Sequence, residues 1–426
     1  MTQTSQKHIV INTFGSFGDL HPYIALALEL LNRGHRVTIA TSGVYKDKIE
    51  SEGIGFHAVR PHMYPGDIPP DLVKKIMDVK AGPEYVIRGL MMPHVGEAYA
   101  DSEPILSTAD LIVTHPLTFA AHLYAEKTGK PWVSTVLQPS VFFSVVDPPI
   151  FANAMWMERF RWLGPGFYRW AFAQIRKVID GWTKPVLDLR GKIGLPPTDR
   201  NPLLDSQYSP QLNLALFSPV FAPPAPDWPA NTKVTGFPIY DRRSKGEGMP
   251  EDLIKFLDDG EPPIVFTLGS SAIFDPGAFY ADSVKAAVDI GRRAVLLAGL
   301  ETNVPKETLP KGIFFCPYAP HSELFPRASA IVHQGGVGTT AQALRSGRPM
   351  LVVPWGQDQP DNAARIVRLG VGRTIMRASY NATTASRELR RLLSDGAYAY
   401  RAKEIGKKIM AEDGTGAAVD AIEELL

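Results

Sequence analysis

The sequence predicts an α/β protein made of two doubly wound domains. Short apolar runs of strand length alternate with helical patterns over the first 140 residues, and the same alternation restarts after residue 250. Strands that alternate with helices form parallel sheets covered by helices on both faces. A chain of 426 residues is also long for a single hydrophobic core, so its length favours two domains.

The elements expected in the first half come from continuous apolar runs and from apolar residues at helical spacing. The segment from Ile150 to Trp182 differs, because it is helical in pattern and unusually rich in aromatic residues. We expect strands at His8–Thr13, Arg36–Ala40, Asp110–Thr114 and Trp132–Val136, and a helix over Leu20–Arg33.

A stretch dense in proline and glycine, followed by charged residues, separates the two halves and marks a linker. We therefore place the first domain at residues 1–238, the linker at 239–250 and the second domain at 251–426, with a last helix that can pack back on the first domain. Further strands are expected at Ile264–Leu268, Ala294–Ala298, Ile313–Phe315, Ala330–His333 and Met350–Val353.

Composition excludes several classes of protein and partner. The 45 basic and 44 acidic residues leave a net charge of +1, so no general positive field attracts nucleic acid. The single cysteine, Cys316, rules out an intrachain disulfide and a cysteine-rich metal site. No signal peptide and no run of about 18 apolar residues that would span a bilayer is visible. We therefore expect a cytoplasmic protein.

A glycine-rich turn in the second half predicts an anion site. The strand before it ends at His333, and a helix begins near Thr339. The turn between them contains Gly335, Gly336 and Gly338. Glycines let the backbone approach a ligand closely, and the amides at a helix start attract anions. The alternative is a strand–helix turn whose glycines serve packing and whose histidine is a core residue.

An acid and an amide follow the next strand of the second half. Asp358 and Gln359 come shortly after Trp355, at the carboxyl end of a parallel strand. Carboxylate and amide groups can bind sugar hydroxyls, because a hydroxyl both donates and accepts hydrogen bonds. The alternative is that Asp358 only caps the helix that begins near Pro360.

The first half contains a related turn. A strand leads through Gly15 and Gly18 to Asp19, just before a helix. Asp19 could simply cap that helix and oppose its dipole. It could also carry chemistry, because a helix start at the carboxyl end of a parallel strand is the usual place for a ligand in such folds.

The order of these residues resembles the nucleotide-sugar box of the family 1 glycosyltransferases. The shared features are a histidine, then Gly-Gly and Gly-Thr-Thr, then Pro-Trp and Asp-Gln-Pro. The resemblance covers nearly the whole chain and is closest to bacterial rhamnolipid-type transferases and to sterol, macrolide and flavonoid glycosyltransferases. It implies the GT-B fold, in which two Rossmann-like domains face each other across a cleft.

The resemblance implies a role for each residue of the donor site. His333 would contact the donor phosphate, and Gly338 and Thr339 would cradle the pyrophosphate. Asp358 and Gln359 would hold the sugar. The rest of the predicted donor site consists of Ser270, Ser271, Tyr318, Gly335, Gly336 and Trp355.

The identity of the donor nucleotide stays open. Tyr318 stands where the family stacks an aromatic ring on the nucleobase, and Ser270 or Ser271 either touches phosphate or only caps a helix. The chain has Ala341 and Gln342 where plant members carry the acid that binds the ribose. A thymidine diphosphate sugar therefore remains a candidate beside a uridine diphosphate sugar.

Asp19 occupies the position of the family's general base, which takes the proton from the acceptor hydroxyl. An aspartate with a pKa near ~4 is a weak base, so burial must raise that pKa. His21 either serves as the base instead or lines the cleft. His115 follows a strand at a position where it could pair with Asp19, or it belongs to the acceptor pocket or the core.

The acceptor pocket is expected in the aromatic region. Phe142, Phe143 and Trp156 are its candidates, together with His21. Aromatic residues at helical spacing are also typical of a plain core. Their density, mixed with arginines, indicates an apolar cleft or a surface that contacts the inner face of a membrane peripherally. The oligomeric state stays open.

These features predict inverting transfer of a hexose from a UDP-glucose or dTDP-rhamnose type donor to a hydroxyl of a hydrophobic small molecule. The candidate acceptors are phenolics such as flavonoids, polyketides, sterols and hydroxyacyl lipids. No Asp-x-Asp occurs, so we expect neither a metal nor another cofactor. The alternatives are a sugar-nucleotide epimerase of the same fold and a protein that binds a nucleotide sugar without catalysis.

Overall fold

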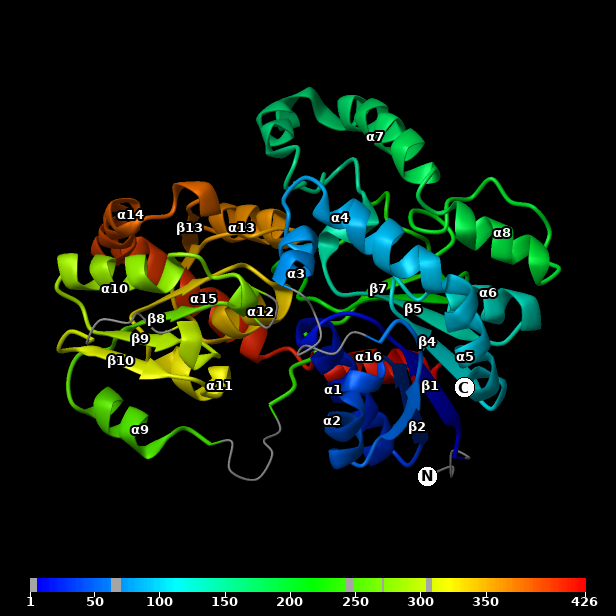
Figure 1. The fold of residues 1–426 in the computed structure, drawn as a ribbon, viewed down its shortest axis with the longest axis horizontal. Coiled ribbons are helices and arrows are strands. Elements are labelled where there is room, and N and C mark those ends of the chain that lie inside the picture. The colour runs from blue at the N-terminus through cyan, green and yellow to red at the C-terminus, as the bar shows by residue number, and fades with distance from the viewer. Residues whose placement is uncertain (1–5, 63–69, 242–247, 270–271, 304–308) are drawn as a thin grey trace.

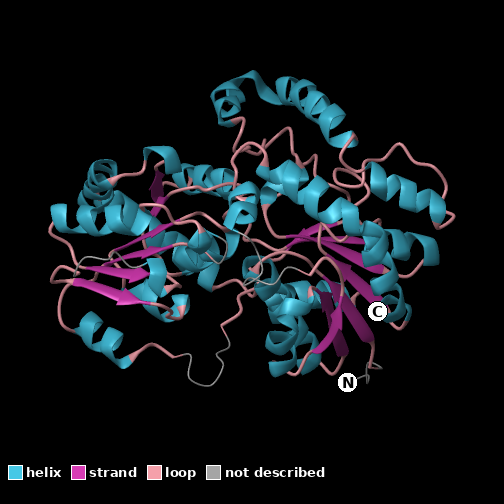
Figure 2. Ribbon diagram, viewed as in Figure 1, coloured by secondary structure: helices cyan, strands magenta, loops and turns pink. Residues whose placement is uncertain are grey.

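The computed structural model describes residues 6–62, 70–241, 248–269, 272–303 and 309–426. It contains two parallel sheets, each with helices on both sides, and the two α/β units lie side by side (Figure 2). This architecture confirms the α/β, doubly wound class that the alternation of strands and helices predicts.

Seven parallel strands form the first sheet, in the order β3-β2-β1-β4-β5-β6-β7. All five residues of β1 are buried, as expected for a strand covered on both faces. Because β1 pairs with both β2 and β4, the direction in which strands are added reverses there. The strands are β1 (His8–Asn12), β2 (Arg36–Thr41), β3 (Gly55–Ala58), β4 (Leu111–Thr114), β5 (Trp132–Val136), β6 (Leu212–Ala215) and β7 (Thr232–Val234).

Helices cover both faces of this sheet because successive residues of a strand point to opposite sides. Ile9 and Ile11 pack with α1, α2 and α16, whereas Val10 packs with α5, α6 and α8. The helices are α1 (Phe17–Asn32), α2 (Lys46–Ser51), α3 (Pro70–Ile76), α4 (Gly82–Glu84), α5 (Val95–Ser107), α6 (Phe119–Thr128), α7 (Gly164–Asp180), α8 (Lys184–Lys192) and α16 (Gly414–Glu423).

The aromatic segment forms a 3-10 helix (Met155–Leu163) followed by α7. In Figure 1, α7 lies at the top of the molecule, outside the layers that flank the first sheet. Trp156, Trp162 and Trp170 are largely exposed. This part of the segment is therefore not an ordinary core.

Six parallel strands form the second sheet, in the order β10-β9-β8-β11-β12-β13, and the order reverses at β8. One face packs on α10 and α14, and the other on α9, α12 and α15. The strands are β8 (Ile264–Thr267), β9 (Ala294–Leu297), β10 (Ile313–Cys316), β11 (Ala330–His333), β12 (Met350–Val352) and β13 (Gly372–Thr374). The helices are α9 (Glu251–Asp258), α10 (Phe279–Asp289), α11 (His321–Leu324), α12 (Val337–Arg345), α13 (Gln359–Arg368), α14 (Ala382–Ser394) and α15 (Gly396–Met410).

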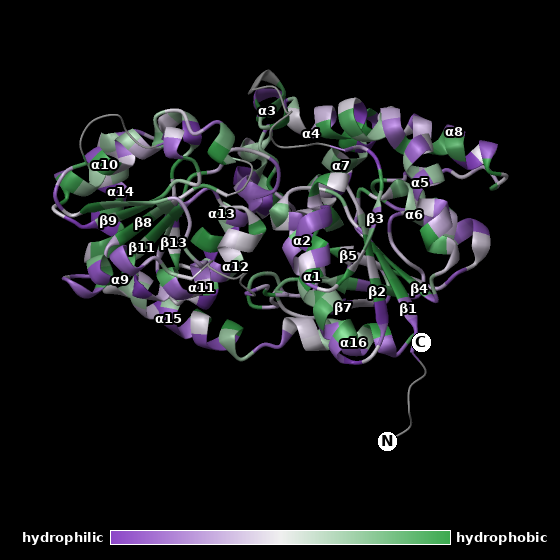
Figure 3. Cartoon of the chain, turned by 60° about the horizontal axis from the view of Figure 1, so that its bottom comes forward, coloured by the Kyte–Doolittle hydropathy of each residue, from purple (hydrophilic) through white to green (hydrophobic). Residues whose placement is uncertain are grey.

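The two units are joined by more than the linker. The strands form a hydrophobic interior in each unit, and the helices around them present mixed hydrophilic and hydrophobic faces (Figure 3). The last helix, α16, packs against α1 of the first unit, where Arg33 donates to Asp420 (2.5 Å) and Glu423 (2.7 Å). One buried cluster contains Phe142 and Phe217 of the first unit together with Val352 of the second.

Candidate active site

The candidate residues gather where the strand order reverses in each sheet. Asp19 follows β1 and His115 follows β4, which are adjacent strands. In the second sheet, His333 ends β11, which pairs with β8. In open α/β sheets, ligands bind outside the carboxyl ends of the strands at such a reversal. Topology therefore brings residues from distant parts of the sequence to two matching positions.

Asp19 is held in the first turn of α1 by its own cap. The backbone N–H of Ser16 donates to Asp19 Oδ2 (2.8 Å), and the Ser16 hydroxyl donates to the same oxygen (3.2 Å). A Cβ on Gly15, whose φ is +132°, would lie 2.2 Å from that oxygen, so only glycine fits there. Burial raises the pKa of Asp19 to about 6, against the effect of the Ser16 hydrogen bonds. The carboxylate is therefore both a cap and a stronger base than an ordinary aspartate.

His115 lies beside the second oxygen of this carboxylate. Its Nε2 is 3.9 Å from Asp19 Oδ1. Burial, aided by the nearby ring of His122, lowers the pKa of His115 to about 3, so the ring is neutral near pH 7. Its Nδ1 accepts from the Leu117 N–H (3.2 Å), which leaves the ring proton on Nε2. The imidazole thus directs an N–H toward Asp19.

His333 presents the same arrangement on the second unit. Its Nδ1 accepts from the Gly335 N–H (3.1 Å), so the proton of the neutral ring is on Nε2. Burial lowers the pKa of His333 to about 3, with a contribution from His321. Nε2 is buried and has no hydrogen-bond partner among the described residues. A buried N–H without a partner is unfavourable unless a ligand satisfies it.

The start of α12 offers backbone N–H groups beside His333. Gly336 is the N-cap residue, and no side chain caps this end of the helix. Gly335 has a φ of +92°, and a Cβ there would lie 2.8 Å from Val352 Cγ1. A Cβ on Gly338, by contrast, would meet no described atom within 4 Å. Packing therefore explains Gly335, whereas at Gly338 the space is open to a ligand.

Asp358 and Gln359 lie at the start of α13. Burial raises the pKa of Asp358 to about 7, and its Oδ2 accepts from Asn362 Nδ2 (2.6 Å). The Gln359 side-chain oxygen accepts from the Trp355 N–H (2.7 Å). The Trp355 indole is only 1% exposed and donates to the Asp275 carbonyl (3.2 Å). Its ring packs inside the domain, so we propose no donor contact for it.

The residue before Asp358 has an unusual backbone. Gln357 has a φ of +57°, which is rare for a residue with a side chain. Its side-chain Nε2 donates to the Ile76 carbonyl at the end of α3 (2.9 Å). The strained backbone next to Asp358 is thus accompanied by a hydrogen bond from the Gln357 side chain to the first unit.

Electrostatic effects link the two sets of residues across the units. The charge of Asp19 contributes to the raised pKa of Asp358, although the two residues belong to different units. The pKa of His321 is lowered to about 4, mainly by burial and then by His21. The His21 ring also lies 5.1 Å from the Tyr240 ring, at the start of the linker.

The remaining predicted residues are distributed unevenly. Thr339 is buried at the start of α12, and Tyr318 is about half exposed after β10. Ser270 and Ser271 lie outside the described residues. The predicted acceptor residues do not form one group: His21 lies between the units, Trp156 is on the exposed 3-10 helix, and Phe142 and Phe143 line a separate hollow.

Sequence reasoning did not identify Asn362 or Asp241. Asn362 bridges the Gly335 carbonyl (2.8 Å) and Asp358, and its place four residues after Asp358 on a helix is the signal that could have revealed it. Asp241 accepts from Gln342 (2.9 Å) and from Arg345 (2.6 Å). These hydrogen bonds join the linker to α12, and no local sequence pattern predicts them.

Two searches concern the described part of the chain alone. Within it, no group of three or more histidine, cysteine, aspartate or glutamate side chains is arranged to hold a metal ion. Among its helices, none combines the length and the apolar character needed to cross a membrane.

Two α/β units, with Asp19 near His115 at one strand reversal and a glycine-rich turn beside His333 at the other, have the arrangement that the resemblance to GT-B glycosyltransferases predicts. Family comparisons match both halves. Residues 9–92 match the glycosyltransferase family 28 N-terminal domain, and residues 285–425 match the C-terminal domain of the erythromycin biosynthesis protein CIII-like family.

Individual relatives agree with this class. O-mycaminosyltylonolide 6-deoxyallosyltransferase of Streptomyces fradiae is 33% identical over 98% of this chain and 97% of its own length. The sterol 3-beta-glucosyltransferase of Leptosphaeria maculans is 31% identical over 97% of this chain, which spans only 28% of that protein. The structure of the spinosyn rhamnosyltransferase SpnG with thymidine diphosphate has a TM-score of 0.68 at 16% identity and covers 98% of this chain and 100% of that one.

The chain belongs to the GT-B glycosyltransferases of family 1. It is therefore a glycosyltransferase, as the resemblance of its nucleotide-sugar box implies. The predicted fold of two Rossmann-like domains is confirmed with it.

Proposed function

We propose that the protein transfers a hexose from a nucleoside diphosphate sugar to a hydroxyl of a hydrophobic small molecule, with inversion at the anomeric carbon. The observation that carries this proposal is that the charge of Asp19 contributes to the raised pKa of Asp358, so the predicted base and the predicted sugar-holding residue lie within electrostatic reach of each other across the two units. A reaction between two bound substrates needs this juxtaposition.

The proposed step is one displacement. Asp19 takes the proton of the acceptor hydroxyl while that oxygen bonds to the anomeric carbon, and the bond from this carbon to the phosphate oxygen breaks. The nucleoside diphosphate leaves with the bonding electrons. The N–H of His333 Nε2 and the free amides of α12 stabilise its charge. These groups are the reason why we propose that no metal is required.

In this proposal, Asp19 and His115 have different roles. Asp19 Oδ2 is occupied by Ser16, so Oδ1 is the oxygen left to accept the proton. The His115 Nε2 lies 3.9 Å from Oδ1, beyond hydrogen-bond distance, so its N–H favours the ionised carboxylate only electrostatically, while Ser16 holds the orientation of the carboxylate. We therefore assign the base to Asp19 and a supporting role to His115.

Substrate classes are proposed from the relatives. The Streptomyces fradiae relative is named for transfer of a deoxysugar to a macrolide, the fungal relative for transfer of glucose to a sterol, and SpnG was solved with thymidine diphosphate. We propose a polyketide, sterol or phenolic acceptor and a uridine or thymidine diphosphate donor. The Gln342 side chain stands where plant members carry the acid that binds the ribose, and it donates a hydrogen bond to Asp241 within the protein. This arrangement is compatible with a nucleoside that has no 2′-hydroxyl.

A transfer screen by mass spectrometry tests the proposal. UDP-glucose and dTDP-rhamnose are each combined with a macrolide lactone, a sterol, a flavonoid and a 3-hydroxyacyl lipid, with a chelator present throughout. A hexose or deoxyhexose adduct is expected with at least one pair, and proton NMR should show the anomer opposite to that of the donor. Retention of configuration, or transfer only when metal is restored, would contradict the proposed mechanism.

A further inference from the structure

The first unit carries an aromatic face that the protein leaves uncovered. The 3-10 helix Met155–Leu163 and α7 together form the aromatic arm, residues 155–180, and α7 lies outside the layers that flank the first sheet (Figure 1). Trp162 is 77% exposed, Trp170 62% and Trp156 57%. Large apolar side chains gathered in water are unfavourable, and an exposed cluster of them indicates an interaction surface. The transfer step proposed above gives these rings no role.

Ring contacts connect the two helices of the arm. Trp156 meets Phe160 edge-on with ring centroids 5.8 Å apart, and Phe160 meets Phe167 of α7 at 5.7 Å. Phe167 in turn lies 6.1 Å from Trp170. Four rings therefore form one continuous strip, whereas hydrophobic residues scattered singly over a surface would need no explanation.

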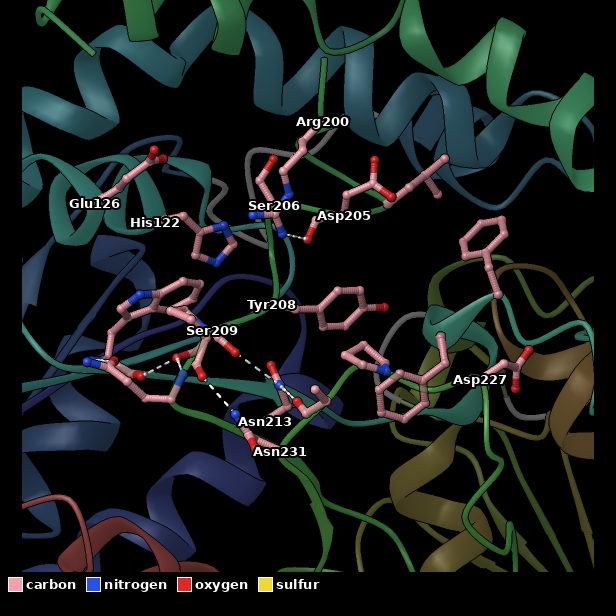
Figure 4. Close-up of a pocket in the computed structure, with 18 of the residues that line it drawn as sticks. His122, Glu126, Arg200, Asp205, Ser206, Tyr208, Ser209, Asn213, Asp227 and Asn231 are labelled. Atoms are coloured by element: carbon pink, nitrogen blue, oxygen red, sulfur yellow. Dashed lines mark hydrogen bonds between the residues drawn. The ribbon is translucent and has the colours of Figure 1, made fainter. Parts of the chain in front are cut away.

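The opposite side of the arm holds it against the first unit. Tyr168 is buried and donates to the Met157 carbonyl (2.6 Å), which joins α7 to the 3-10 helix. Ile179 is buried as well. Arg176 donates to Asp205 (3.0 Å), one of the residues that line the hollow shown in Figure 4. Packing on this side fixes which side of α7 faces outward, so the exposure of the strip is a property of the folded chain.

Positive charge accompanies the strip. The aromatic arm contains five basic and two acidic residues, although the whole chain has a net charge of only +1. Arg159 and Arg169 are exposed, and among the described residues neither forms an ion pair. Side chains three residues apart eclipse in a 3-10 helix, so Arg159 lies on the same face as Trp156 and Trp162. Tryptophans with unpaired arginines beside them are typical of helices that lie in the headgroup region of an anionic bilayer.

A second copy of this chain is the alternative occupant of the face. In a two-fold dimer the same surface of each copy faces the other, so the positive charges of the two arms would meet without acidic partners. The centre of a protein interface is also depleted of charged residues, whereas Arg159 lies between two exposed tryptophans on one helical face. An anionic lipid surface supplies both an apolar layer for the rings and phosphates for the guanidinium groups. The charge of the arm therefore favours a membrane.

We propose that the outward face of the aromatic arm docks the protein peripherally on an anionic lipid bilayer. Trp162 and Trp170 enter the headgroup region, and Arg159 and Arg169 bind lipid phosphate. The protein then partitions between solution and membrane according to lipid charge and ionic strength. This inference does not depend on the proposed transfer reaction.

Cosedimentation of the full chain with unilamellar vesicles tests the proposal. One set of vesicles is phosphatidylcholine alone, and the other contains about 30 mol% phosphatidylglycerol as the anionic lipid. Wild type should sediment with the anionic vesicles and stay in solution with the neutral ones. Salt screens the attraction, so the partition coefficient should fall at least about tenfold between about 0.05 and 0.5 M NaCl. No nucleotide or acceptor is present, so the result is independent of catalysis.

Two double variants separate the contribution of the rings from that of the charges. Trp162→Ala with Trp170→Ala should lower the partition coefficient at least about tenfold, because the apolar area is lost. Arg159→Gln with Arg169→Gln should lower it about 25-fold at low salt, since each basic residue near an anionic surface contributes about fivefold. The binding that remains in the arginine variant should depend less on salt than that of wild type.

Matched controls come from α15 of the second unit, which also exposes an aromatic ring and basic residues. Tyr400→Ala removes an exposed ring, and Lys403→Gln with Lys408→Gln removes the same charge as the arginine variant. Both controls should sediment as wild type does. Unfolding temperatures are compared throughout, and if the tryptophan variant is unstable, the arginine variant decides, because its two side chains lose no ion pair among the described residues.

Several results would overturn the proposal. Wild type that fails to bind anionic vesicles, or that binds neutral vesicles equally well, contradicts it. Equal losses in the α15 controls would assign the binding to general charge. Light scattering that shows a wild-type dimer, a monomer for the tryptophan variant and no vesicle binding would assign the face to a second copy. Wild type that binds vesicles but transfers no sugar would refute the proposed function and leave this contact standing.

Discussion

At the scale of single residues, the chemistry depends on where two neutral histidines hold their protons. His115 and His333 each accept a backbone N–H at Nδ1 and present an N–H at Nε2. One is directed at the Asp19 carboxylate, and the other is buried without a partner at the start of α12. The same local arrangement, a histidine at the end of a strand followed by a tight turn, thus lies beside the proposed base in one unit and at the proposed phosphate site in the other.

Replacement of Asp19 by asparagine should separate catalysis from binding. The variant keeps the shape of the side chain but cannot accept the acceptor proton, so kcat should fall roughly 10²–10⁴-fold. Isothermal titration calorimetry with UDP or dTDP should give a Kd close to that of wild type. Wild-type turnover by Asp19→Asn would show that another group is the base, and His21 would be the next residue to test.

The pH profile should report the raised pKa of Asp19. The carboxylate must be ionised to act as a base, so kcat/KM should fall with a slope of one as the pH drops below about 6 and level off above it. The hydrogen bonds from Ser16 oppose the shift, so Ser16→Ala should move the acid limb to higher pH. Initial rates between pH 4.5 and 9 measure the acid limb of wild type and of Ser16→Ala. An acid limb at the same pH in both proteins would show that a group other than Asp19 causes it.

Removal of the unpartnered imidazole of His333 should weaken the donor specifically. A lost hydrogen bond to a charged phosphate corresponds to about 1.5–3 kcal/mol, so His333→Ala should raise the Kd of the nucleotide about 10–100-fold. The unfolding temperature without nucleotide should also fall, because the buried imidazole leaves a cavity and the Gly335 N–H loses its acceptor, so the nucleotide Kd is measured well below that temperature. Asp19→Asn is the matched control, since it should leave the nucleotide Kd unaltered.

At the scale of elements, the turn between β11 and α12 contains glycines of two kinds. Gly335 is required by its positive φ and by contact with β12, whereas Gly338 lies inside α12 with open space around it. The sequence pattern treats both as parts of one glycine-rich motif. Only their backbone angles and neighbours separate a packing glycine from one that leaves room for a ligand.

A pair of alanine substitutions should distinguish these roles. Gly335→Ala should lower the unfolding free energy by about 1–3 kcal/mol because of its backbone conformation and its contact with Val352. Gly338→Ala should instead raise stability by about 0.5–1 kcal/mol, the helix preference of alanine over glycine, while it weakens nucleotide binding. Thermal unfolding and calorimetry measure the two effects. Unchanged nucleotide affinity in Gly338→Ala would remove this residue from the donor site.

At the scale of the whole molecule, buried charges connect the two units beside the predicted sugar site. Arg365 of α13 is 3% exposed and donates to Asp147 of the first unit (2.5 Å) and to Asp361 (2.8 Å). Asp361 also accepts from the Ile150 N–H (3.1 Å). Although burial acts to raise the pKa of Asp147, Arg365 and Arg161 hold it below its usual value. The helix that begins with Gln359 is thereby fixed against the segment that leads to α7.

Loss of one partner from this network should be costly. Arg365→Met leaves the buried Asp361 carboxylate without its charged partner, which typically lowers the unfolding free energy by about 3–5 kcal/mol. The double variant Asp147→Asn, Arg365→Met should lose less than the sum of the single variants. The exposed pair Arg390–Asp289 is the control, where substitution should change stability by less than about 1 kcal/mol. Additive effects across the first pair would show that the two units are not coupled there.

Short strands at or next to the edges of the sheets mark the limit of predicting secondary structure from this sequence. The prediction omitted β3, β6, β7 and β13, each of three or four residues. In β6 the polar Asn213 interrupts the apolar run, and its side chain is satisfied only by residues brought near by the fold. The strands at the centre of each sheet were predicted well because both of their faces are buried, which requires a continuous apolar run.

The sequence by itself determined the class of this protein. Periodicity predicted two parallel-sheet domains, and the residues around His333, Asp358 and Asp19 predicted a glycosyltransferase through their resemblance to the nucleotide-sugar box of family 1, whose glycine turns and helix starts are local features of the sequence. Tertiary structure alone decided that Asp19 lies beside His115 and faces Asp358, that Trp355 packs inside the domain, and that His122 opens on a separate hollow. Such facts depend on strand order and side-chain packing between residues far apart in the chain, which no local pattern records.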